Sequence, residues 1–173
     1  MTESVYINNI ELDMLHDLFV FDLENGKVFW KNPPKHHSRL LNQEAGHQVN
    51  NRSGKIYWKI KINSKNIFRS HIIFYVANGY RAFPCIDHIN GNSLDDRPCN
   101  LRQATQTENC WNHKTRKKTT NLPMGIRQQN KKFVARISHN NKPIYLGTFT
   151  NLEDAINIYK QKRIELYGQF SGY

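Results

Sequence analysis

The chain contains 173 residues and carries a formal net charge of +11, a length that allows one or two small domains with modest cores. The basic excess predicts a polyanionic partner, and nucleic acid is favoured over a membrane surface because no basic amphipathic helix with a clean apolar face is recognisable. No apolar run approaches transmembrane length and no signal-peptide pattern begins the chain, so we expect a cytoplasmic protein without a membrane partner.

Residues 1–83 are predicted to be rich in β-strand. The Asn-Gly pair at 25–26 is the strongest hairpin signal in this part, and a returning strand follows it at 28–30. Residues 31–55 are rich in Pro, His, Asn and Gly, which predicts a loop.

A second hairpin and a helix follow that loop. Apolar and polar side chains alternate over residues 57–62, so one face of this strand is expected to be buried and the other basic. The chain turns at 63–66 and returns. A helix is then predicted over 70–78, with Ser70 as its cap and Gly79 as its stop.

The histidines of this part are interpreted as structural or exposed. His36 and His37 lie in the predicted loop, and the alternative is a role as ligands or DNA contacts. His71 lies at the start of the predicted helix. We interpret it as a packed or hydrogen-bonded side chain rather than a ligand.

Residues 86–112 hold most of the candidate chemistry. A short strand is expected at 86–89, followed by a turn and a polar excursion over 93–100. The excursion leads into a helix that we expect over 104–112. The candidates for the cap of that helix are Thr105 and Thr107.

The cysteine pattern argues against a disulfide framework and against a four-thiolate zinc site. The cysteines are odd in number and form no C-x-x-C pair. We expect reduced, structural thiols, with a zinc site that includes His113 as the open alternative. The three residues are Cys85, Cys99 and Cys110.

A basic block without acidic residues follows the central segment. From Asn109 to Leu152 the chain has no Asp or Glu, against nine Lys and Arg. Such a block repels itself unless an anion lies against it, so we expect contacts with DNA. Residues 113–123 are interpreted as a basic linker, and its alternative is a solvated, mobile run. Lys117 and Lys118 are candidate DNA contacts in this linker.

Residues 124–173 are predicted to form a three-stranded sheet backed by one amphipathic helix. Thr150 or Asn151 is expected to cap this helix, and its apolar positions include Ile164. The strands are expected at 124–129, 133–138 and 144–149. The sheet face opposite the helix carries Arg127, Gln129, Arg136 and Tyr145.

Three residues of the central segment suggest phosphodiester chemistry. Asp87 and Asn109 offer hard oxygen atoms, which suit Mg²⁺. His88 offers a nitrogen that exchanges a proton near neutral pH. A cation and a base on one hairpin and helix could hydrolyse a phosphodiester.

The sequence IDHINGNSLDDRPCNLRQATQTEN, from Ile86 to Asn109, resembles the HNH (ββα-metal) nucleases of phages and introns. The resemblance implies that Asp87 and Asn109 hold one Mg²⁺ or Mn²⁺ ion and that His88 is the general base. It also implies a catalytic role for Asn100, which steadies the loop and orients the histidine. Arg102 is only a candidate for assisting the phosphate.

The sequence from Gly125 to Phe170 is similar to the DNA-binding domain of plant ethylene-response factors, through Tyr-Leu-Gly-Thr-Phe and the closing Tyr-Gly-x-Phe. The resemblance implies a sheet that lies in the major groove of DNA. A basic, solvated sheet face is the alternative. The implied contacts are Arg127, Gln129, Lys132, Arg136 and Tyr145.

We therefore expect an α+β protein with an HNH nuclease domain at 1–112, a basic linker at 113–123 and a DNA-binding domain at 124–173. The predicted function is that of a site-specific, homing-type endonuclease, encoded by a phage or mobile element in a bacterial cell. It would act on double-stranded DNA as a monomer or homodimer. The alternatives are a DNA-binding regulator that does not cut and a structure-selective nuclease; an RNA substrate is disfavoured.

Overall fold

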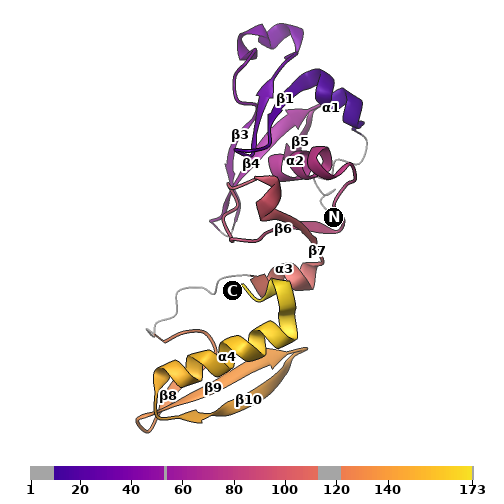
Figure 1. Ribbon diagram of the computed structural model, residues 1–173. Coiled ribbons are helices and arrows are strands. Elements are labelled where there is room, and N and C mark those ends of the chain that lie inside the picture. The colour runs from indigo at the N-terminus through magenta and orange to yellow at the C-terminus, as the bar shows by residue number, and fades with distance from the viewer. Residues whose placement is uncertain (1–9, 53, 113–121, 173) are drawn as a thin grey trace. The chain divides into compact units, whose positions relative to one another are not determined.

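The structure is a computed structural model that describes residues 10–52, 54–112 and 122–172. Within that part the chain is a mixed α+β protein of small antiparallel sheets and helices (Figure 1). The α+β class expected from the sequence is confirmed. The chain divides into two compact units, Met1–Gln106 and Thr107–Tyr173, and each has its own apolar core.

The first unit begins with a short helix and a β-hairpin. Helix α1 (Leu12–Leu18) buries Leu15 in the core, and the predicted hairpin pairs β1 (Phe19–Asp22) with β2 (Lys27–Trp30). Gly26 in the turn has a φ of +65°, which glycine adopts without strain. The sequence did not predict α1, because two helical turns are too short to show a clear apolar period.

A three-stranded sheet follows in the order β3-β4-β5. Strands β4 (Ile56–Ile62) and β5 (Lys65–Phe68) form the second predicted hairpin. Their turn consists of Asn63 and Ser64, both with positive φ, as a two-residue hairpin turn requires.

The predicted loop at 31–55 is wrong in two places. It contains a 3₁₀ helix at Lys35–Leu40 and strand β3 (His47–Asn50), which pairs with β4. Strand β3 is an edge strand whose side chains are mostly exposed. It is therefore held by backbone hydrogen bonds and shows no apolar alternation in the sequence.

Helix α2 (Arg69–Asn78) fills the middle of the first unit. It ends as predicted at Gly79, which has a φ of +75°. The predicted cap at Ser70 is wrong, because the helix begins at Arg69 and Phe68 takes the cap position without a side-chain hydrogen bond. Strand β5 runs directly into this helix, so no separate capping residue lies between them.

A hairpin and a helix close the central segment. Strand β6 (Cys85–His88) pairs with β7 (Leu101–Ala104), and a 3₁₀ helix at Pro98–Asn100 leads into β7. Helix α3 (Gln106–Asn112) follows after one residue. The sequence assigned residue 104 to the helix and missed β7, whose four residues pair through the backbone and show little alternation of their own.

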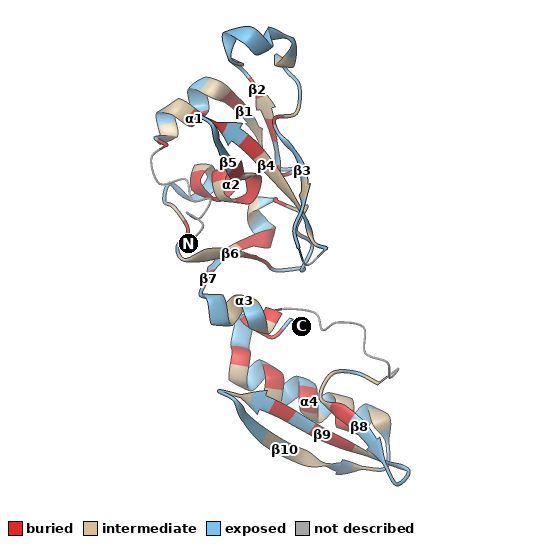
Figure 2. Cartoon of the chain, turned by 180° about the vertical axis from the view of Figure 1, so that it is seen from behind, coloured by how far each residue is buried: buried red, intermediate tan, exposed pale blue. Residues whose placement is uncertain are grey.

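The second unit has the predicted sheet and helix. Its strands β8 (Ile126–Gln129), β9 (Lys132–His139) and β10 (Lys142–Phe149) lie in the order β10-β9-β8. Helix α4 (Leu152–Tyr167) packs on one face of the sheet, and Figure 2 shows the buried residues of both as red bands. As expected, the side chain of Asn151 caps α4 by accepting a hydrogen bond from the backbone of the first turn.

One position of α4 differs from the prediction. Ile164 is 52% exposed, whereas the neighbouring Arg163 is 6% exposed. The guanidinium of Arg163 donates to the hydroxyl of Tyr159 and to the backbone carbonyls of Trp111 and Ser171. These bonds satisfy a buried charge and connect α4 to the last residues of α3 and to the C-terminal segment.

Helix α3 belongs largely to the second unit because of its last residues. The ring of Trp111 lies 4.7 Å from that of Tyr167, in addition to its carbonyl bond with Arg163. The division between the units falls after Gln106, whereas the predicted domain ended at residue 112. The predicted linker contacts Lys117 and Lys118, and the His113 of the zinc alternative, lie outside the described residues.

Candidate active site

Two of the predicted site residues lie at the end of strand β6. Asp87 and His88 are both buried, at 4% and 9% exposed. In the β6–β7 pair, Asp87 is opposite Arg102 and His88 is opposite Leu101. Adjacent residues of a strand point to opposite faces, so these two side chains have different partners.

Arg102 is bonded to the carboxylate of Asp87. Its Nε and Nη2 both donate to Oδ2, at 2.8 and 2.6 Å. Hydrogen bonds between two charged groups are short and strong, and this pair is largely shielded from water. The guanidinium therefore offsets the charge of the residue that the sequence assigns to a metal ion.

The predicted donor atoms suit a hard cation. The carboxylate of Asp87 and the side-chain amide of Asn109 supply oxygen, the ligand type of Mg²⁺ and Mn²⁺. Among the described residues, no group of three or more His, Cys, Asp or Glu side chains could hold a metal. Asp87 lies in the first unit and Asn109 in α3 beyond the division, so their meeting at one ion remains a prediction.

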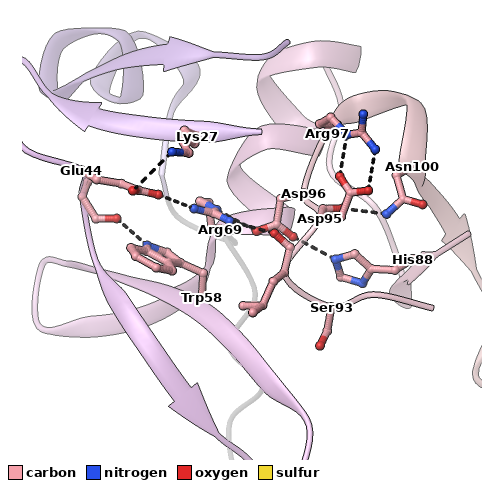
Figure 3. Close-up of polar contacts among 12 residues, drawn as sticks. Lys27, Glu44, Trp58, Arg69, His88, Ser93, Asp95, Asp96, Arg97 and Asn100 are labelled. Atoms are coloured by element: carbon pink, nitrogen blue, oxygen red, sulfur yellow. Dashed lines mark hydrogen bonds and ion pairs between the residues drawn. The ribbon is translucent and has the colours of Figure 1, made fainter. Parts of the chain in front are cut away.

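A buried carboxylate that the sequence did not single out joins His88 to Arg69 (Figure 3). Asp96 is 2% exposed; its Oδ1 lies 2.8 Å from His88 Nε2 and its Oδ2 lies 2.7 Å from Arg69 Nε. An ionised carboxylate only accepts hydrogen bonds, so the proton of this contact belongs to Nε2. In the neutral ring, Nδ1 is then the nitrogen that carries the lone pair.

Besides Asp96, Arg69 contacts several other segments of the first unit. Its Nη1 donates to Glu44 Oε1 at 2.7 Å and its Nη2 to the carbonyl of Leu94 at 3.1 Å. The guanidinium also lies 4.7 Å from the ring centre of Trp58, whose indole N–H donates to the carbonyl of Ala45. Figure 3 shows Glu44, Trp58 and Asp96 around this guanidinium.

Asn100 closes the loop that follows His88. Its Oδ1 accepts from the backbone N–H of Asn90 at 2.9 Å, and its Nδ2 donates to the carbonyl of Asp95 at 2.7 Å. Its carbonyl accepts from the N–H of Ile89. Asn100 thus holds both ends of the loop, while the carboxylate bonded to the histidine ring is Asp96.

The same loop contains a second ion pair, between Asp95 and Arg97. Both oxygens of Asp95 accept from Arg97 at 2.7 Å. These bonds, together with the one that Asn90 donates, lower the pKa of Asp95 to about 2. Asp95 raises the pKa of Arg97 in turn. The loop therefore keeps its own charges in pairs.

His71 lies near this cluster, in the first turn of α2. Its ring stacks on Phe68 with the centres 6.1 Å apart, in agreement with the predicted structural role. Burial lowers the pKa of His71 to about 4, and the positive charge of a protonated His88 acts in the same direction. Asp96 opposes this shift. His71 is therefore neutral at physiological pH.

The cysteines match the sequence prediction only in part. All three carry free thiols. Cys85 is partly buried and its thiol donates to the carbonyl of Ala104. Cys99 and Cys110 are exposed, so the expected structural role applies to Cys85 alone.

A basic face lies on the sheet of the second unit. Cross-strand pairs join Arg136 to Tyr145 and Gln129 to Lys132. Since side chains alternate along each strand, the five predicted DNA contacts share the face opposite α4. The guanidinium of Arg136 lies 5.9 Å from the ring centre of Tyr145. All five of these residues are exposed: Arg127, Gln129, Lys132, Arg136 and Tyr145.

Sequence reasoning missed Asp96, Arg69 and Glu44. The available signal was the Asp-Asp doublet in a segment that already held the candidate base. Arg69, which lies 27 residues earlier in the chain, bonds Asp96 and so determines which of the two aspartates turns inward. None of the helices in the described part of the chain has the length and apolar character needed to span a bilayer.

Comparison with known proteins gives one informative similarity. No model of a known protein family and no solved structure matches the chain. Protein 3.8 of Escherichia phage T7 is 37% identical to it over 90 residues, which cover 51% of this chain and 74% of that protein. Since the match spans most of the phage protein at this level of identity, the chain belongs to the family of phage T7 protein 3.8.

Proposed function

We propose that the chain is a metal-dependent DNA endonuclease of the HNH type, encoded by a phage or mobile element. The observation that carries the proposal is the setting of His88, held by Asp96 beside Asp87 at the end of a β-hairpin. The hairpin continues directly into α3, which bears Asn109. This order of strand, strand and helix supplies a proton acceptor and oxygen ligands close together in the chain.

The residues of the central segment, from β6 to α3, act on water and on the phosphate. His88 takes the proton of the attacking water at Nδ1, an effect typically worth about 10²–10⁴ in rate. Asn100 holds the loop behind the ring. Asp87 and Asn109 would hold the divalent ion. When bound, such an ion offsets the charge that develops on the phosphate and the leaving oxygen.

The second unit binds the duplex in this proposal. Its sheet face carries Arg127, Gln129 and Arg136, in a stretch of the chain without acidic residues. Arg and Gln can read guanine and adenine edges in the major groove, and Lys132 and Tyr145 add phosphate and stacking contacts. A DNA duplex as the partner accounts for the net charge of +11, because the basic side chains would lie against its phosphates.

One observation favours a second candidate, a DNA-binding regulator that does not cut. The carboxylate of Asp87 is already bonded to a cation, the guanidinium of Arg102. A metal ion would have to compete with that ion pair. In a regulator, the pair would simply stabilise the hairpin.

Nicking of supercoiled plasmid distinguishes the two candidates. We expect the wild-type chain to cut in Mg²⁺ or Mn²⁺ and to stop when EDTA is added. His88→Ala should lower the rate by about 10²–10⁴ while its affinity for the same DNA is kept. His16→Ala changes an exposed histidine of α1 and should cut like wild type.

The nuclease and the regulator predict different outcomes. Wild-type protein that binds DNA but cuts no substrate in either metal supports the regulator. Normal cleavage by His88→Ala would show that His88 is not the base, even if the chain is a nuclease.

A further inference from the structure

We propose that Asp96 is a positioning residue for His88, and that Arg69 fixes the roles of the two Asp96 oxygens. Asp96 would hold the imidazole in the tautomer that keeps Nδ1 as the proton acceptor. This inference rests on the proposed function and names a residue that the predicted motif roles leave out.

Asp96 lies between two donors and has one oxygen for each. Oδ1 faces His88 Nε2 and Oδ2 faces Arg69 Nε, at 2.8 and 2.7 Å. The carboxylate is 2% exposed, and the Arg69 side chain is 5% exposed. Water therefore does little to screen these bonds, and each group strongly constrains the others.

The backbone at Asp96 is held from an independent direction. A Cβ atom placed on Gly26 would come within 2.5 Å of the Arg97 nitrogen and 2.7 Å of the Asp96 carbonyl carbon. The turn of the first hairpin thus lies directly against this peptide. Glu44 and Trp58 hold the guanidinium of Arg69 on its other sides. The N-terminal strands serve as the support on which the candidate base is aligned.

This arrangement makes a specific claim about Asp96→Asn. An amide has one accepting oxygen and one donating NH₂ group, whereas Arg69 can only donate. Hydrogen bonds to a charged group are the stronger ones, so the amide oxygen should turn to Arg69. The NH₂ group then faces His88 Nε2, which must accept. The ring changes to the tautomer with its proton on Nδ1, and the accepting nitrogen is lost.

The experiment combines tautomer measurement with kinetics. Protein with ¹⁵N-labelled histidine gives the tautomer of each ring by NMR at neutral pH, and His88→Ala identifies the signals of His88. We expect Nε2–H in the wild type and Nδ1–H in Asp96→Asn. Plasmid cleavage by Asp96→Asn should fall by about 10²–10⁴ in kcat, the range of a lost general base, with KM unchanged.

Asp95→Asn is the matched control. It changes the neighbouring carboxylate of the same loop, whose side chain pairs with Arg97 and Asn90 rather than with the histidine. We expect this variant to keep the Nε2–H tautomer of His88 and to cut within about twofold of wild type.

Three results would overturn the inference. They are an Nδ1–H tautomer of His88 in the wild type, an unchanged tautomer in folded Asp96→Asn, and normal cleavage by that variant. The wild-type spectrum decides the matter even if Asp96→Asn fails to fold. If the wild type cuts no DNA, the proposed function fails, whereas the tautomer data still decide what Asp96 does to His88.

Discussion

At the scale of single residues, the candidate site consists of buried charges in pairs. Asp87 is bonded to Arg102, and Asp96 is bonded to Arg69 and His88. Removing one partner of a buried pair leaves the other uncompensated, which typically costs about 3–5 kcal/mol. Substitutions here therefore test both folding and chemistry, and each needs a readout for both.

Arg102→Met tests whether Asp87 can take a cation. Without the guanidinium, the carboxylate loses its charge partner and the melting temperature should fall. Mg²⁺ should then raise the melting temperature of the variant more than that of the wild type, because the ion no longer competes with Arg102. Calorimetric melts with and without Mg²⁺ measure this. Lys162→Met removes a surface ion pair with Glu165 and should show no such gain.

His71 gives the folded state a defined acid sensitivity. Its pKa is 6.5 in its ordinary state and about 4 in the fold, so between these values the unfolded chain binds a proton that the folded chain does not. Stability should therefore fall as the pH drops from 6.5 to 4, by at most roughly 3 kcal/mol.

His71→Gln removes the titrating imidazole, so the stability of this variant should depend less on pH between 6.5 and 4. Urea unfolding at a series of pH values is the measurement. An equally steep decline in the variant would assign the acid sensitivity to other groups.

At the scale of elements, the hairpin turn at Gly26 links the N-terminal strands to the Asp96 loop. Gly26→Ala would face both a positive φ and a clash with the backbone at Asp96 and Arg97. We expect a loss of stability larger than the about 1–2 kcal/mol of a left-handed alanine. In the fraction that folds, cleavage should be slower because His88 is misaligned.

Gly79→Ala separates the cost of the positive φ from the cost of the backbone clash. Gly79 has a similar φ, +75°, but open space around the position of its missing Cβ atom. This variant should show the cost of the left-handed backbone alone and cut like wild type. Equal behaviour of the two variants, by thermal melts and plasmid nicking, would argue against a link between the turn and the site.

At the scale of the whole molecule, the proposed function places the candidate base in the first unit and the DNA-binding face in the second. Truncation after residue 112 would leave the first residues of the second unit and remove the partners of Trp111, so point substitutions are the cleaner test. Arg127→Ala and Arg136→Ala should each weaken DNA binding. Each should also lower the slope of log K against log salt by about 0.9, the effect of one lost phosphate contact.

Lys160→Ala is the control, because this exposed lysine belongs to α4 and not to the sheet. Its slope should match that of the wild type. Titrations by fluorescence anisotropy over a range of salt concentrations give the slopes of the wild type and of the three variants. Unchanged slopes in both arginine variants would move the DNA-binding surface away from this sheet face.

The sequence by itself determined the elements whose signals are local. Alternation predicted β4, the Asn-Gly pair predicted the first hairpin, and turn residues with an N-cap predicted the three strands and α4 of the second unit. It also placed the candidate base and Asp87 side by side. Such signals span a few residues and depend on backbone geometry and on which face is buried.

Only the tertiary structure decided which polar groups are buried and with what partners. Asp96 rather than Asp95 faces His88, Arg163 rather than Ile164 is enclosed in the second unit, and α3 joins that unit through its last residues. These choices depend on contacts between residues far apart in the chain, such as Arg69 and Asp96. A buried charge is stable only where the fold brings a partner group close to it, and the local sequence does not contain that information.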